Sequence, residues 1–205
     1  MFKKNRGFTL VELMVAISIV ILLMSVVLFN YFSVNGSLSV SSAAQELAIS
    51  IREAQFYGLN VKQTSAGRFD SAYGVYFNPG SNPSDYIIFV DSNTNPGDRA
   101  GRYDAGNGCG SSSTECVERV NLRDGVTISG VCNDDVSESN CSLNPSLHSM
   151  HIVFKRPEPD ASISFANGGG IITSSSQLVG KIYLRSQSGN TAYVFVRKTG
   201  QIMAK

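Results

Sequence analysis

The sequence predicts an α+β protein, in which a long N-terminal helix precedes an antiparallel β domain. Three observations predict this: an apolar run from Phe8 to Phe29, a second stretch with apolar residues every three or four positions, and a series of short β-branched and aromatic runs. The 205 residues suit one domain with an appended segment. The net charge of +1 excludes an overall field that would draw the whole molecule onto nucleic acid.

The apolar run is long enough to cross a membrane. Phe8 to Phe29 is 22 residues, and a helix of that length reaches about 33 Å, against about 30 Å for the hydrocarbon core of a bilayer. Lys3, Lys4 and Arg6 precede it, and basic flanks stay in the cytoplasm. We therefore expect the N-terminus inside and the chain from Asn30 onward exported. A secretory signal fits less well, because its apolar core is shorter and no A-x-A-like site follows this one.

Glu12 is the one ionisable side chain in this run. An ionised carboxylate inside a membrane costs about 2.5 to 3.5 kcal/mol on insertion scales, so it normally has a partner. A cut between Gly7 and Phe8 would create an α-ammonium one helical turn from Glu12. The two charges could then neutralise each other, within one chain or between neighbours.

Residues Gly7 to Glu12 read GFTLVE, which resembles the processing and assembly motif of type IV pilins and type II secretion pseudopilins. The resemblance implies that prepilin peptidase cuts after Gly7, that Phe8 becomes the N-methylated first residue, and that Glu12 is the assembly glutamate. It implies a pilin-like fold, without a cofactor and without enzymatic activity. The alternative is a plain single-pass anchor with an accidental GFTLVE.

The expected organisation follows from this resemblance. We expect four segments: a leader peptide at 1–7, a transmembrane helix at 8–29, the exported half of the helix at 30–60, and a β-rich head at 61–205. The expected partners are other pilin subunits, the prepilin peptidase and methyltransferase, an inner-membrane assembly platform and membrane lipid. A minor pilin of a type IV pilus-like filament is the first choice, and a type II secretion pseudopilin is the alternative.

An amphipathic helix is expected beyond the span. Its apolar stripe consists of Val40, Ala44, Leu47, Ala48, Ile51, Ala54 and Gly58. We interpret it as the continuation of the membrane helix, loosened or kinked at Asn35-Gly36, with the stripe packed on a sheet. The stretch AAQELAISIREAQ resembles the same region of GspH/FimT-type minor pilins and pseudopilins, where a stem helix precedes an all-β head.

Seven or eight strands are expected in the head. The candidate runs are YGVYF, DYIIFV, VERVNL, VTISGV, MHIVFK, SISFA, KIYLRS and AYVFVR, separated by Gly, Pro, Asn and Asp. The glycine run 168–170 is interpreted as a hairpin connection ahead of the C-terminal strands.

Two long polar connections, 91–115 and 132–147, each hold or border a pair of cysteines. Since an exported domain meets oxidising conditions in many settings, the simplest interpretation is two local disulfides, Cys109 with Cys116 and Cys132 with Cys141. Three pairings exist in principle.

Two groups of residues have the types of side chain that bind metal ions. His148 and His151 with Cys132 and Cys141 miss the usual zinc spacings, and histidines three apart on a strand face opposite sides. Asp91, Asn93 and Asn95 alternate as at the start of a calcium loop, with Asp98 or Asp104 as further oxygen donors. Pro96 stands where an EF-hand requires Gly, so an Asx-rich turn is the favoured interpretation and calcium the minor one.

No G-x-S-x-G, H-E-x-x-H, C-x-x-C or P-loop motif occurs in the chain. Some minor pilins of the FimT type take part in DNA uptake through basic residues near the C-terminus. The matching cations here are Arg185, Arg197, Lys198 and Lys205. They could give weak, salt-sensitive DNA binding. The alternative is an ordinary solvated edge-strand face.

Overall fold

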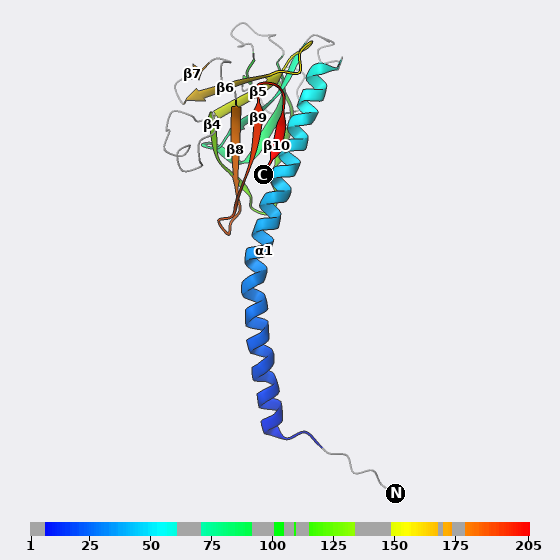
Figure 1. Cartoon of the computed structure of the whole chain (residues 1–205). Coiled ribbons are helices and arrows are strands. Elements are labelled where there is room, and N and C mark those ends of the chain that lie inside the picture. Colours follow the sequence, from blue (N-terminus) through cyan, green and yellow to red (C-terminus); the bar gives the residue numbers. More distant parts are fainter. Residues whose placement is uncertain are drawn as a thin grey trace.

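The computed structural model describes residues 7–60, 71–91, 101–104, 109, 115–133, 149–167, 170–173 and 179–205, without the side chains of 29–33, 167 and 170–173. Among these residues a single helix, α1 (Leu10–Leu59), precedes the strands, and its first half extends away from the β head as a stalk (Figure 1). The strands are β1 (Ala72–Asn78), β2 (Asn82–Asp91), β3 (Cys116–Asn121), β4 (Thr127–Asn133), β5 (Ser149–Phe154), β6 (Ala161–Asn167), β7 (Gly170–Thr173), β8 (Val179–Arg185), β9 (Thr191–Arg197) and β10 (Ile202–Ala204). The predicted α+β, pilin-like architecture is confirmed.

Helix α1 has 50 residues, which is about 75 Å at 1.5 Å per residue. It stays one unbroken helix through Asn35 and Gly36, where the sequence predicted a loosening or a kink. The glycine has a different role there. A Cβ atom on Gly36 would lie 1.7 Å from Oγ of Ser188, in the turn between β8 and β9. Glycine therefore lets the turn between β8 and β9 approach the helix backbone closely at this position.

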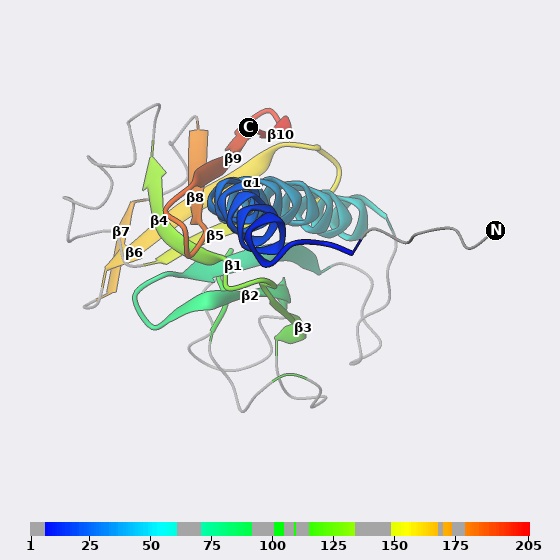
Figure 2. The same ribbon diagram turned by 90° about the horizontal axis from the view of Figure 1, so that it is seen from below.

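Two antiparallel sheets form the head. One has the strand order β3-β2-β1-β5-β6-β7 and the other β10-β9-β8-β4. Seen along α1, strands β1 to β3 lie on one side of the helix and β8 to β10 on the other (Figure 2). Both sheets and the second half of the helix share one core.

The core confirms the predicted apolar stripe of the helix. Val40, Leu47 and Ile51 are almost completely buried, and they pack in one cluster with inward-facing side chains of both sheets. The sheet residues of this cluster include Val75, Phe77, Ile152, Phe154, Ile163, Ile182, Leu184, Val194 and Val196. Gly58 sits at the end of the stripe, where a Cβ atom would lie 2.4 Å from the carbonyl oxygen of Phe154.

Seven or eight strands were expected, and all eight candidate runs form strands, with β7 and β10 in addition. β10 is only three residues long and follows a turn at Gly200, which has a φ of 78°. β7 pairs with β6 and begins at Gly170, so this glycine belongs to a strand and not to the predicted connection 168–170. Residues 168 and 169 lie outside the described residues. Both strands were too short for a pattern of alternation to reveal them.

Candidate functional site

The GFTLVE segment forms the start of helix α1. Gly7, Phe8 and Thr9 precede the helix without regular structure. Thr9 is the N-cap, and its Oγ1 accepts a hydrogen bond of 3.2 Å from the backbone N–H of Glu12. Threonine at the cap with glutamate three residues later is the spacing of a capping box. Glu12 therefore lies in the first turn, where the helix dipole favours a negative charge.

The bond between Gly7 and Phe8 is open to solvent. Phe8 is 77% exposed. Among the described residues, none apart from the chain neighbours of Gly7 lies within 4 Å of a Cβ atom built on that glycine. This bond also lies before the first residue of the helix.

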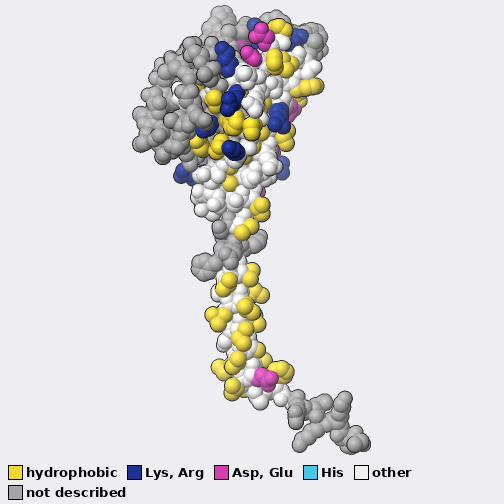
Figure 3. Space-filling model, in the orientation of Figure 1, with side chains coloured by type: hydrophobic (Ala, Val, Ile, Leu, Met, Phe, Trp, Pro, Cys, Tyr) yellow, Lys and Arg dark blue, Asp and Glu magenta, His cyan; other side chains and the backbone are white. Residues whose placement is uncertain are grey.

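The first half of α1 is predominantly apolar and exposed. Leu10–Leu28 has 19 residues with a mean hydropathy of 2.8, and none of it is buried. Figure 3 shows hydrophobic side chains along this part of the stalk. At about 28 Å the segment matches the thickness of a bilayer core. The structure therefore contains a helix long and apolar enough to anchor the head in a membrane.

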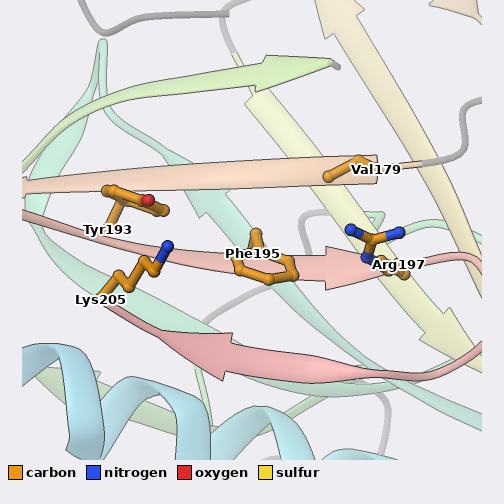
Figure 4. Close-up of a pocket in the computed structure, with 5 residues that line it drawn as sticks. All are labelled: Val179, Tyr193, Phe195, Arg197 and Lys205. Atoms are coloured by element: carbon orange, nitrogen blue, oxygen red, sulfur yellow. The ribbon is translucent and has the colours of Figure 1, made fainter. Parts of the chain in front are cut away.

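The outer face of the sheet β8–β9–β10 carries aromatic side chains between cations. On β9, Ala192, Val194 and Val196 point into the core, so Tyr193, Phe195 and Arg197 point outward. A shallow pocket of about 190 Å³ lies there, lined by Val179, Tyr193, Phe195, Arg197 and Lys205 (Figure 4). None of these five lining residues is acidic.

Backbone pairing fixes the cations beside the rings. Lys205 continues β10, because it exchanges two backbone hydrogen bonds with Tyr193, of 2.8 and 2.9 Å. The Arg197 guanidinium lies 5.7 Å from the ring centroid of Phe195, and Lys181 Nζ lies 5.1 Å from that of Tyr193. In the space-filling view, Lys and Arg side chains lie among hydrophobic ones over these strands (Figure 3).

The structure places the four cations predicted as DNA contacts at three different positions. Arg197 and Lys205 line the same pocket. Lys198 lines a different one with Glu158 and Asp160, so acidic neighbours offset its charge. Arg185 lies at the far end of β8, opposite Thr191.

Sequence reasoning missed the aromatic members of this face, Tyr193 and Phe195. The alternation within TAYVFVR was the available signal, because it places every second residue of that strand on the outer face.

A second cluster lies on the outer face of the other sheet. His151 is buried with Tyr76, Phe89 and Tyr103 around it. Its Nδ1 accepts a hydrogen bond of 3.0 Å from the backbone N–H of Tyr103. Burial, and secondarily the nearby Arg102 charge, lower the pKa of His151 to about 3. The imidazole is therefore neutral at physiological pH and serves as a packed hydrogen-bond acceptor.

Residues 101–104 form a short strap over this cluster. Asp91 Oδ2 accepts a hydrogen bond of 2.7 Å from the Gly101 N–H, and Glu115 Oε2 accepts one of 2.7 Å from the Asp104 N–H. Glu115 precedes Cys116, which forms the predicted disulfide with Cys109. The disulfide thus lies next to one of the points that hold the strap.

Parts of the remaining predicted sites lie outside the described residues. Cys132 is disulfide-bonded, but Cys141 is not described, so its pairing with Cys132 stays a prediction. His148, Asn93, Asn95 and Asp98 also lie outside the described residues. Within the described part of the chain, no group of three His, Cys, Asp or Glu side chains is placed to hold a metal ion.

Comparison with known proteins gives one match. The family described as the prokaryotic N-terminal methylation motif matches residues 2–28. No curated protein and no solved structure matches the chain. The motif and the apolar helix together support a type IV pilin-like protein, and they point to a structural subunit rather than an enzyme.

Proposed function

We propose that this chain is a structural minor pilin of a type IV pilus-like filament, made as a precursor and assembled through its N-terminal helix. The observation that carries the proposal is the methylation motif at the start of an exposed apolar helix that continues into the core of the head. An enzyme would not require that continuity. A fibre subunit requires it, because the anchor must hold the head at a fixed position.

The proposed sequence of events uses named residues. Prepilin peptidase removes residues 1–7 by cutting the exposed bond between Gly7 and Phe8, and the new N-terminus is methylated. The resulting cation lies one turn before Glu12, so the carboxylate no longer has to enter lipid without a partner. Before the cut, the basic flank within residues 1–7 sets the orientation, with the N-terminus in the cytoplasm and the head outside the inner membrane. An assembly platform then moves the helix into a bundle with other pilin helices.

Replacement of Glu12 tests the assembly role. In cells that make the fibre, Glu12→Ala should reach the membrane and lose its leader, yet be absent from sheared fibres. Glu46→Ala removes an exposed acid from the same helix outside the membrane segment and should assemble normally. The N-terminal mass of the cellular protein gives the processing readout. An intact leader in the wild-type chain, or normal fibre incorporation of Glu12→Ala, would contradict the proposal.

The main alternative is a type II secretion pseudopilin, which would share the leader, the helix and the assembly steps. Loss of the chain should then block protein export and leave surface fibres in place. For a minor pilin we expect the reverse, with fewer or shorter fibres and unchanged export.

A second candidate function is DNA binding by an exported subunit. The observation that favours it is the pocket in which Arg197 and Lys205 lie together without an acidic neighbour among its lining residues. Such cations bind phosphates through counterion release. Binding should weaken steeply with salt, and Arg197→Gln should weaken it further in a gel shift. No binding at low salt would remove this candidate and leave the pilin proposal intact.

A further inference from the structure

We propose that the outer face of β8, β9 and β10 binds single-stranded nucleic acid, with bases stacked on Tyr193 and Phe195 and phosphates held by Arg197 and Lys205. The inference rests on the second candidate function above. It adds the form of nucleic acid that is recognised and the side chains that select it.

The spacing of the two rings favours an unpaired strand. Tyr193 and Phe195 are two residues apart on β9, so their positions are separated by about 6.8 Å. Bases along one strand of a duplex repeat every 3.4 Å or so, with their faces covered by neighbours. A strand drawn out of the stack can place one base on each ring, and a duplex cannot. Aromatic rings with a nearby positive groove are the usual means of binding unpaired strands.

The charges lie where phosphates of such a strand would run. In Figure 4 the Lys205 amine points toward β9 between the two rings, and Arg197 lies beyond Phe195. Arg197 is also within cation–π distance of the Phe195 ring. A base that stacks on Phe195 would take the place of this cation, and the released guanidinium would bind the neighbouring phosphate. The same exchange at Tyr193 would release Lys181, whose Nζ lies 5.1 Å from the centroid of that ring. An anionic polysaccharide could use the same cations, but it offers no flat base to the rings.

Polarisation of labelled probes tests this with the full-length chain in non-ionic detergent micelles at low salt. The probes are an oligonucleotide of about 15 nucleotides, a blunt duplex of the same sequence, and an abasic strand with the same number of phosphates. The variants are Tyr193→Leu and Phe195→Leu, which keep apolar volume without the ring, and Arg197→Gln. Lys198→Gln is the matched control, since it removes a charge that lies beside Glu158 and Asp160 instead.

The wild-type chain should prefer the single strand over both other probes. Each leucine variant should weaken its binding by roughly fivefold to a hundredfold, the range expected for loss of one stacked base. Arg197→Gln should lower the salt dependence, and Lys198→Gln should change affinity by less than about twofold. The abasic comparison needs no variant, so it remains decisive if a leucine variant unfolds early.

Equal binding of the single strand and the abasic strand would overturn the stacking proposal, as would tighter binding of the duplex. Either result would leave DNA binding itself standing. Absence of binding by every probe would remove both, and the fibre assignment would be unaffected.

Discussion

Two isoleucines on α1 provide a matched test of how the helix meets the head. Ile51 is completely buried, and Ile49, two positions away, is 62% exposed. Ile51 packs in the core shared by both sheets, so Ile51→Ala should leave a cavity and destabilise the head by about 2 to 5 kcal/mol. Ile49→Ala removes a side chain that mainly contacts solvent. Its effect should stay within about 0.5 kcal/mol, helped by the higher helix propensity of alanine.

The measurement is urea unfolding of the fragment 34–205, which keeps the helix residues described as buried and omits the membrane segment. Non-reducing conditions keep the disulfides. The midpoint of Ile51→Ala should fall clearly below those of the wild type and Ile49→Ala, with a similar slope. Equal destabilisation by the two variants would refute the helix register described above, because the register alone separates the two residues.

Three further predictions concern the head. The pKa of His151 is lowered to about 3, below the value of about 6.5 for an unfolded chain. The unfolded state therefore binds more protons between these two values, and the free energy of unfolding decreases as the pH is lowered from about 6.5 toward 3. The loss between pH 7 and pH 5 should be about 2 kcal/mol. In urea unfolding at both pH values, His151→Asn should lose that part of the pH dependence, and an unchanged dependence would contradict the assignment. The Cys109→Ser and Cys116→Ser double variant removes the Cys109–Cys116 disulfide and should lower the free energy of unfolding by roughly 2 to 3 kcal/mol by the loop-entropy estimate. Hydrogen exchange of the Tyr103 amide should also become faster. An exchange rate equal to that of the wild type would contradict this. Tyr86→Phe should lower the free energy of unfolding by about 1 to 3 kcal/mol, measured by thermal unfolding, because the buried Tyr86 hydroxyl forms a hydrogen bond of 2.8 Å with Ser50 Oγ. Ser50→Ala added to Tyr86→Phe should then cause little further loss. A large second loss would contradict this pairing.

The local patterns of the sequence were sufficient for the elements but not for their arrangement. The stripe from Val40 to Gly58 and the eight alternating runs reflect burial of one face, which each segment carries in its own residues. The division into two sheets depends on pairs distant in the chain, such as β4 with β8. The spacing of residues within a segment does not predict which distant strand it pairs with.

The candidate sites show the same difference. The GFTLVE segment could be predicted as a processing motif because its functional groups lie within six consecutive residues. The outer face around Tyr193 could be predicted only in part. Alternation along β9 predicts which of its side chains point outward, but Lys205 lies on this face through the pairing of β10 with β9. In the sequence Lys198 is a cation near the C-terminus, and only the fold brings it next to Glu158 and Asp160. His151 looked like a metal ligand by type, and the backbone of Tyr103 occupies its acceptor nitrogen.

The unbroken course of α1 has a mechanical consequence. The same helix provides the apolar stalk and a large part of the core of the head, so tension on the stalk enters the core without crossing a flexible joint. Pulling along the helix axis would have to slide a whole packed surface past two sheets at once. Such a shear geometry distributes load over many contacts, and it makes the head a rigid link for transmitting force.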